Sequence, residues 1–263
     1  MQLQFSKYQG TGNDFVILDA WNNLPELNKD HVIRLCDRKY GIGADGLMII
    51  RKHKDYDFEM IYFNADGLLG SMCGNGGRCL VQYAYNKGYI SDKTNFIATD
   101  GEHEAIIDFS RNWVSLKMGN VEEVKLREGG DCYVNTGSPH IVRWVEDPEI
   151  IDVLAEGKFI RNSIEFKQHG TNVNFVKVAD SKIYIRTFER GVEDETLSCG
   201  TGVTASVIAA AATKKISTEK TGCEVITCGG NLFVKFEKHE NVYNNIWLEG
   251  PAKFVFEGTI ELI

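Results

Sequence analysis

One short pattern, Cys-Gly-x-Gly, occurs twice in the chain, at Cys73–Gly76 and at Cys199–Gly202, with the two cysteines 126 residues apart. A helix is expected directly after each copy, over about 76–87 and 200–215, because apolar residues recur there at helical spacing. Gly88 provides a stop after the first of these helices. We therefore predict that each half of the chain presents one cysteine from a loop at the start of a helix.

The two halves also share a second pair of similar segments, Gly10–Val16 and Gly170–Val176. Two matched pairs in the same order along the chain indicate two similar domains rather than a chance likeness between glycine-rich loops. We place the domains at residues 1–118 and 119–252. The final run, residues 253–263, could add a strand to the first domain, and its periodicity does not decide this.

The 263-residue chain carries a net charge of −8, which excludes a basic nucleic-acid-binding surface as its dominant feature. Its most apolar stretch, residues 203–212, is shorter than the roughly 20 residues needed to span a bilayer. Residues 1–7 lack the apolar run of a secretory signal. We therefore expect a cytoplasmic protein with reduced cysteines and with no nucleic-acid or membrane partner.

Much of the remaining chain has the pattern of short strands. Three pairs of runs are predicted to form hairpins: 104–109 with 113–118, 172–178 with 182–188, and 225–227 with 232–236. A third helix, amphipathic, is expected at 28–38. The helix at 200–215 is apolar on nearly every side, so we expect a sheet to wrap around it. These features predict an α+β fold with many strands and few helices.

A cysteine at the start of a helix lies beside backbone N–H groups that have no intrahelical partner, and beside the positive end of the helix dipole. Both stabilise a thiolate. Glycines on either side let a ligand approach the backbone closely, so the same loop can hold a carboxylate. A single loop of this kind is weak evidence, since phosphate-binding loops look similar, but two related copies are much stronger.

Two such cysteines around one ligand suggest the inversion of a carbon stereocentre. A thiolate on one face removes a proton from carbon, and a thiol on the other face supplies one. The carbanion formed between these steps needs N–H donors around the substrate carboxylate. Cys73 and Cys199 are therefore the predicted catalytic pair, and this chemistry requires no cofactor.

The motifs around these cysteines resemble those of the diaminopimelate epimerase family, and related segments run along nearly the whole chain. The segments that carry the resemblance are 12–16, 41–46, 64–67, 72–79, 139–140, 170–175, 189–191, 195–196, 199–202 and 250–252. Asn75, within the first cysteine motif, favours this family over the related proline racemases, which typically carry histidine there.

The resemblance implies a cofactor-independent epimerase that interconverts LL- and meso-2,6-diaminopimelate in lysine and peptidoglycan-precursor biosynthesis. It also implies two similar domains, each a mixed sheet wrapped around a central helix, with the active site in the interdomain cleft, and a homodimer. The substrate-binding positions of the family fall on Asn13, Asn64, Gly74, Asn75, Asn172, Glu189, Arg190, Gly200 and Thr201. Arg190 would pair with the distal carboxylate, and His140 matches a supporting histidine near the reacting centre.

Several positions depart from the commonest pattern of the family, among them Glu193–Asp194, which make the loop between Arg190 and Cys199 one residue longer than in some members. Ser138 stands where many members have a substrate-binding asparagine, and Gly46 stands where some have a substrate-contacting glutamine. Leu68 replaces a frequent serine. None of these changes removes a catalytic group.

Several alternatives remain open at the level of the sequence. The chain could be a proline or hydroxyproline racemase of the same superfamily, a thiol redox device, or a non-enzymatic amino-acid-binding protein. Redox cysteines usually lie close in sequence, and binding alone does not need two thiols. Glu189 and Arg190 could form an ordinary surface ion pair, and the asparagines could be turn residues.

The other five cysteines are expected to be small buried hydrophobic residues: Cys36, Cys79, Cys132, Cys223 and Cys228. The remaining histidines form no metal-ligand spacing, so no metal site is expected.

Overall fold

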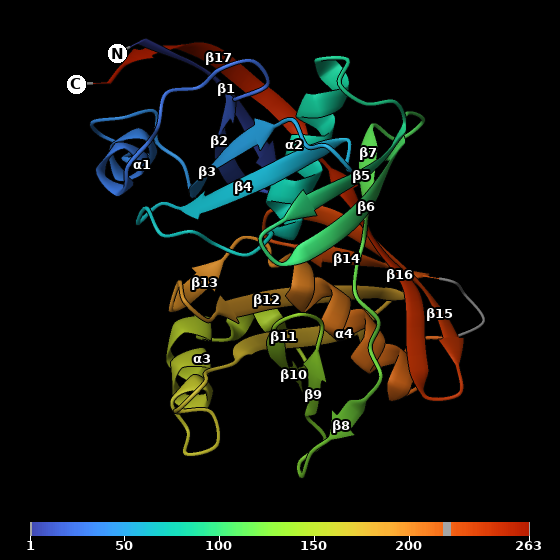
Figure 1. The fold of residues 1–263 in the computed structure, drawn as a ribbon. Helices are drawn as coiled ribbons and strands as arrows, with labels where there is room; N and C mark the ends of the chain where they lie inside the picture. The colour runs from blue at the N-terminus through green and yellow to red at the C-terminus, as the bar shows by residue number, and fades with distance from the viewer. Residues whose placement is uncertain (1, 218–221, 263) are drawn as a thin grey trace. The chain divides into compact units, whose positions relative to one another are not determined.

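The computed structural model describes residues 2–217 and 222–262 of the chain (Figure 1). The chain divides into two compact units. The first unit comprises the described residues of 1–116 and 250–263, and the second those of 117–249. The corresponding domains expected from the sequence were 1–118 and 119–252. Those ranges and the final run also include residues 1, 218–221 and 263, which lie outside the described residues.

The described residues of the first unit form a mixed sheet in the spatial order β17–β1–β2–β3–β4–β5–β6–β7. The strands are β1 (Gln2–Gly10), β2 (Asn13–Asp19), β3 (Gly46–Arg51), β4 (Phe58–Asn64), β5 (Lys93–Ala98), β6 (Gly101–Asp108), β7 (Trp113–Lys117) and β17 (Lys253–Glu261). β2 and β3 are parallel, as are β4 and β5, and the other neighbours are antiparallel. Each parallel pair needs a crossover, which α1 (Lys29–Cys36) and α2 (Gly74–Asn86) provide.

The second unit repeats this arrangement in the order β8–β9–β10–β11–β12–β14–β15–β16. Its strands are β8 (Val124–Leu126), β9 (Cys132–Asn135), β10 (Pro139–Trp144), β11 (Asn172–Ala179), β12 (Lys182–Glu189), β14 (Gly222–Thr227), β15 (Gly230–His239) and β16 (Val242–Pro251), with a short β13 (Asp194–Thr196) beside β12. The parallel pairs are β10 with β11 and β12 with β14. Their crossovers contain the 3-10 turn η1 (Pro148–Ile150) with α3 (Val153–Arg161), and α4 (Gly200–Ala212).

The same sequence of parallel and antiparallel pairings in both units makes α2 equivalent to α4 and α1 equivalent to α3. The prediction that the two cysteine motifs occupy matching places is therefore confirmed. The second pair of similar segments does not occupy matching places, because β2 corresponds to β10 and β3 to β11. Gly10–Val16 precedes and enters β2, whereas Gly170–Val176 enters β11, so these two segments are alike in sequence but occupy different positions in the repeat.

The helices α2 and α4 lie at the centres of their units, where they contact most of the strands of the surrounding sheet. In α2, 10 of 13 residues are buried, and in α4, 11 of 13 are buried. The expected wrapping of an all-round apolar helix by a sheet is therefore confirmed, and so is the α+β class with two similar halves. Both central helices begin at the residue after the cysteine.

The helix α3 was not expected from the sequence. Gly157 lies in its middle, and glycine weakens a helical pattern because it loses more backbone conformational entropy than other residues when it becomes helical. The structure gives the reason for this glycine: a Cβ at residue 157 would lie 2.3 Å from Cβ of Phe188 on β12. The helix can pack against β12 only because residue 157 has no side chain.

The three predicted hairpins are confirmed by the antiparallel pairs β6–β7, β11–β12 and β14–β15. β17, whose place the sequence left undecided, pairs along its length with β1 of the first unit. Among the residues that the structure describes, no helix combines the length and the apolarity needed to cross a membrane.

Candidate active site

Cys73 is the N-cap residue of α2 and is half-buried. Its side chain makes no capping hydrogen bond to the first turn of the helix. The thiol instead lies 3.6 Å from Oδ1 of Asn13, to which it can donate. The sulfur thus lies at the positive end of a buried helix with an amide oxygen as a neighbour.

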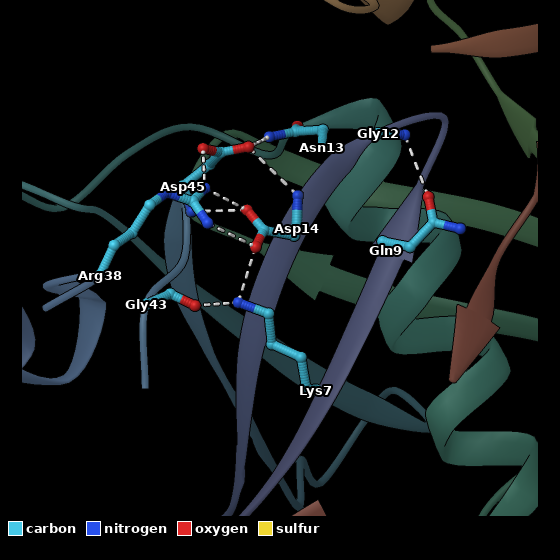
Figure 2. A network of polar contacts seen from close by, with 8 residues as sticks. All are labelled: Lys7, Gln9, Gly12, Asn13, Asp14, Arg38, Gly43 and Asp45. Carbon is cyan, nitrogen blue, oxygen red and sulfur yellow. Dashed lines mark hydrogen bonds and ion pairs between the residues drawn. The ribbon is translucent and has the colours of Figure 1, made fainter. Parts of the chain in front are cut away.

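The orientation of the Asn13 amide is fixed by a carboxylate (Figure 2). Its Nδ2 donates to Oδ2 of Asp45 over 2.6 Å, which leaves Oδ1 facing Cys73 and Nδ2 of Asn75. A carboxylate oxygen can only accept, so the amide cannot be flipped without losing this bond. Asp45, which lies just before β3, therefore positions a predicted substrate-binding side chain.

Asp45 and Asp14 belong to one charged network, shown in Figure 2. Arg38 donates to both carboxylates, with Nη2 at 2.7 Å from Asp14 and 2.8 Å from Asp45. Lys7 pairs with Asp14 at 2.7 Å and also donates to the Gly43 carbonyl. Burial acts to raise the pKa of Asp14, but the hydrogen bonds from Arg38 and Lys7 outweigh it and hold that pKa at about 2. This network gives the loop that carries Asn13 a rigid support.

Asn75 is 1% exposed, and protein groups already engage its side chain. Oδ1 accepts from Nη2 of Arg78 at 2.9 Å and from the Thr11 hydroxyl at 3.3 Å. The Asn75 side chain is therefore held within the protein, and the backbone role predicted for Gly74 and Asn75 stays a prediction. Burial lowers the pKa of the fully buried Arg78 to about 10, so it is charged at neutral pH beneath the first turn of α2.

Asn64 ends β4 and has an exposed side chain. It lies opposite Gly46 in the β3–β4 register. A Cβ at Gly46 would lie 2.5 Å from the ring of Tyr62, so a glutamine would not fit at this position of the chain. The Tyr62 ring occupies the space that such a side chain would need.

Cys199 is the N-cap residue of α4 and is 7% exposed. Its sulfur lies 3.4 Å from the Thr201 hydroxyl. The backbone carbonyl of Thr201 accepts from the Thr136 hydroxyl at 2.9 Å, and this bond ties the first turn of α4 to the end of β9. The two cysteines therefore share a helix position, but one lies beside an amide oxygen and the other beside a hydroxyl.

His140, on β10, is fully buried next to this first turn, with Nε2 2.9 Å from the Thr201 hydroxyl. Burial, and then the charge of Arg190, lower the pKa of His140 to about 3, so the ring is neutral at physiological pH. A neutral buried imidazole cannot be a strong acid, but it can orient the hydroxyl beside Cys199.

Asn172, on β11, holds the backbone of Arg190. Its Oδ1 accepts from the Arg190 N–H at 2.8 Å, and its Nδ2 donates to the Ser138 hydroxyl at 2.8 Å and to the Pro139 carbonyl at 3.0 Å. Both amide hydrogens are thus engaged within the protein. The observed contacts give Asn172 the role of shaping the loop, with Ser138 as one of its partners.

The Arg190 side chain is exposed, and its Nη1 donates to the His169 carbonyl at 2.9 Å. Gly170, with φ of +70°, lies against the stem of this side chain: a Cβ there would be 2.7 Å from Cδ of Arg190. Glu189 accepts from the Thr196 hydroxyl at 2.8 Å. Glu189 and Arg190 therefore lie at the end of β12, and the backbone carbonyl of His169 orients the Arg190 guanidinium.

Four of the five cysteines expected to be buried are buried: Cys36, Cys79, Cys132 and Cys223. Burial raises the pKa of Cys36 to about 11 and that of Cys79 to about 12, so neither forms a thiolate readily. The expectation was wrong for Cys228, which is exposed because it lies in the turn between β14 and β15.

The contacts of Asp45, Arg78 and Asn174 were not predicted from the sequence, although all three residues lie inside the motifs that carry the family resemblance. Asn174 contacts His140 and Arg78 contacts Asn75. The spacing of Asn172 and Asn174 was an available signal, because residues two apart on a strand share a face. Arg78 gave no such signal, since an arginine within a helix is usually exposed.

The sequence was compared with those of known proteins. The profile of a family described as diaminopimelate epimerase matches residues 5–124 and 132–255. A diaminopimelate epimerase from Flavobacterium psychrophilum is 47% identical, and the alignment covers 98% of this chain and 100% of that protein. The diaminopimelate epimerase of Chlorobaculum tepidum is 39% identical over 96% of this chain and 99% of the relative.

Solved structures with low sequence identity have the same fold. A phenazine biosynthesis protein of the PhzF family from Bacillus anthracis superposes with a TM-score of 0.74 at 14% identity, covering 100% of both chains. A hydroxyproline epimerase from Agrobacterium vitis superposes with a TM-score of 0.72 at 12% identity, covering 99% of this chain and 93% of that one. The two-unit fold therefore supports more than one chemistry, and at these identities it does not choose between them.

Proposed function

The chain belongs to the diaminopimelate epimerase family, and from this we propose that it interconverts LL- and meso-2,6-diaminopimelate. The observation that carries the proposal is the identity of 47% to a diaminopimelate epimerase along the whole chain. The placement of Cys73 and Cys199 at equivalent helix starts supports it independently. The family is an isomerase family of lysine biosynthesis, and we further propose a role in supplying peptidoglycan precursors.

In the proposed reaction, Cys73 and Cys199 address the same Cα from opposite sides. One enters as a thiolate and removes the α-proton, and the other enters as a thiol and returns a proton to the opposite face. The roles exchange in the reverse direction, so each direction leaves the other cysteine charged.

The negative charge that develops at Cα and on the α-carboxylate needs fixed donors. We propose that the N–H groups in the first turns of α2 and α4, at Gly74–Asn75 and Gly200–Thr201, supply them. Backbone donors at a helix start need no reorganisation as the charge forms, which is what makes such stabilisation effective.

The distal end of the substrate carries a second carboxylate and an ammonium group. We propose that Arg190 binds the carboxylate, since a guanidinium fork matches carboxylate geometry. Asn13, Asn64 and Glu189 would accept from the ammonium group. Asn172 would contribute to substrate binding indirectly, because its side chain holds the backbone of Arg190.

No cofactor is required by this two-thiol scheme, because each proton transfer uses a group that the chain itself supplies. We propose that the enzyme works without pyridoxal phosphate, in the cytoplasm. Reduced thiols would be maintained there.

We also propose that the enzyme is a homodimer. On β17, consecutive apolar residues are unusually exposed: Phe254 by 50%, Val255 by 50% and Phe256 by 44%. An apolar strand surface of this kind marks a contact site more often than a solvent-facing one.

The function is tested by incubating the protein with LL-diaminopimelate in D₂O and following the loss of the Cα–H signal by NMR. We expect exchange together with the appearance of the meso isomer. The same assay with L-proline and trans-4-hydroxy-L-proline addresses the rival racemase activities. Exchange with either of these but not with diaminopimelate would overturn the proposal, and so would the absence of exchange with all three.

A further inference from the structure

We propose that Asn174 is a positioning residue that fixes the proton of His140 on Nε2, so that the Thr201 hydroxyl donates its hydrogen to the Cys199 sulfur. The catalytic meaning of this chain of contacts rests on the proposed function. The contacts themselves involve only the second unit and can be measured without turnover.

Strand register brings the groups together. In the parallel pair of β10 and β11, His140 lies beside Asn172, and Val142 lies beside Asn174. Asn172 and Asn174 are two residues apart, so both side chains lie on the face of the sheet that carries His140. In the antiparallel pair of β11 and β12, Asn174 lies beside Thr187.

The orientation of the Asn174 amide follows from the Ile141 carbonyl, a partner with only one hydrogen-bonding role. Nδ2 lies 3.1 Å from the Ile141 carbonyl, which can only accept. Oδ1 accepts from the Thr187 hydroxyl at 3.0 Å. The second hydrogen on Nδ2 points at Nδ1 of His140, 3.1 Å away. Nδ1 must therefore accept, and it cannot carry a proton.

A neutral imidazole with a bare Nδ1 carries its proton on Nε2. Nε2 lies 2.9 Å from the Thr201 hydroxyl oxygen and donates to it. Asn172 Nδ2 is also 3.5 Å from Nε2, but its two hydrogens are directed at the closer Ser138 hydroxyl and Pro139 carbonyl. It therefore does not compete for the ring.

Burial, and then the charge of Arg190, keep the His140 ring neutral. The neutral tautomer thus persists across the pH range in which a cysteine titrates. The His140 ring therefore stays neutral while Cys199 gains or loses its own proton.

Because the Thr201 oxygen already accepts from His140, its own hydrogen is available for another acceptor. The Cys199 sulfur is 3.4 Å away. A hydrogen bond donated to sulfur stabilises the thiolate relative to the thiol. With the proton on Nδ1 instead, Nε2 would accept from Thr201, and the sulfur would lose this donor.

The second glycine of the Cys-Gly-Thr-Gly motif has a role in this arrangement. A Cβ at Gly202 would lie 2.5 Å from Oδ1 of Asn174 and 3.3 Å from Cε1 of His140. Only glycine lets the first turn of α4 lie directly against the Asn174–His140 pair. The motif therefore provides close contact with the sheet as well as access for a ligand.

The experiment measures the pH dependence of alkylation at Cys199, read at peptide level by mass spectrometry, with Cys73 in the same sample as an internal reference. In Thr201→Val we expect the midpoint to rise by about one pH unit, which is about tenfold less thiolate at neutral pH. Thr201→Ser should restore the parent midpoint because it keeps the hydroxyl. Cys73 should be unaffected in both variants.

The tautomer is read by ¹⁵N NMR of the histidine rings, with His140 assigned from the signal missing in His140→Gln. We expect the parent to carry its proton on Nε2 and Asn174→Leu to show a mixture, with a smaller rise in the Cys199 midpoint. A parent ring protonated on Nδ1 would overturn the proposal, as would an unchanged midpoint in Thr201→Val. Failure of the D₂O exchange assay with these results intact would instead overturn only the proposed function.

Discussion

Cys73 and Cys199 occupy the same place at the starts of α2 and α4, yet their surroundings differ. Cys73 faces an amide oxygen on Asn13, whereas Cys199 faces the hydroxyl of Thr201. An acceptor and a donor act on a thiol in opposite directions. At the scale of single residues, the repeat has conserved the backbone position of the two thiols and changed their immediate partners.

Replacing either cysteine by alanine should remove most turnover without unfolding the protein. General acid–base catalysis contributes about 10²- to 10⁴-fold, so we expect kcat to fall by at least about 100-fold in Cys73→Ala and in Cys199→Ala. The exposed Cys228 supplies a matched control, and Cys228→Ala should keep the parent rate. Near-parent turnover in either active-site variant would remove that cysteine from the mechanism.

The buried His140 should make the protein less stable in mild acid. Its pKa is about 3 in the folded protein, below the ordinary value of 6.5. Between these two pH values the His140 ring is protonated in the unfolded chain but neutral in the folded protein. Its contribution to stability is complete above about pH 6.5 and is lost as the pH falls. We expect a loss of about 2 kcal/mol in unfolding free energy between pH 7 and pH 5.

Denaturant unfolding at both pH values measures this loss, and His140→Gln should lack it. The exposed His239 is the matched control, since it is largely in solvent in the folded protein. The same pH dependence in His140→Gln and in the parent would contradict the assignment. Asp14 does not interfere, because its lowered pKa affects stability only below about pH 4.

At the scale of elements, the two central helices end in the same way with different residues. After α2, Gly88 has φ of +72°, and the N–H groups of Gly88 and Tyr89 close onto the carbonyls of Tyr85 and Ala84. After α4, the matching residue is Lys214, with φ of +58°. The left-handed backbone conformation costs a lysine free energy that a glycine does not pay.

Substitutions at Gly88 and Lys214 should change the free energy of unfolding in opposite directions. Gly88→Ala should cost about 1 kcal/mol, and this cost is purely conformational because nothing lies within 4 Å of the added Cβ. Lys214→Gly should gain about 0.5 kcal/mol, since relief of the backbone exceeds the lost interaction with the helix end. Denaturant midpoints with unchanged m-values would verify both. A loss in Lys214→Gly would contradict the argument.

The elements themselves were predictable to different degrees. The central helices and the three hairpins followed from periodicity, glycine stops and turn residues. The helix α3 did not, because Gly157 is there for the contact with Phe188 rather than for the helix. The likeness of Gly10–Val16 to Gly170–Val176 does not correspond to matching positions, because these similar glycine-rich sequences enter different strands of the repeat.

At the scale of the whole molecule, the proposed reaction requires the two thiols to approach one carbon from opposite sides. Mild oxidation of the substrate-free enzyme should then link Cys73 to Cys199 and abolish activity, and reduction should restore it. Peptide mapping by mass spectrometry detects the link. An oxidised, inactive protein without this link would count against the proposed approach of the two thiols.

The proposed homodimer is tested on β17. Val255→Glu and Phe256→Glu lie on opposite faces of the strand, and the variant on the interface should shift the protein to monomers in light scattering after size exclusion. Lys253→Gln, at an exposed position on the same strand, is the control and should remain dimeric. A dimer that survives both glutamate variants would place its contact elsewhere.

The sequence by itself determined the class of fold, the matching places of the two cysteines and the family, because these depend on local patterns: helical periodicity, glycine stops and motifs that are contiguous in the chain. The tertiary structure decided the rest. β17 belongs with β1, Asp45 fixes the Asn13 amide, and Asn174 reaches His140 through strand register. These contacts join residues distant in sequence, and their hydrogen-bond directions depend on which atoms the folded strands bring within about 3 Å.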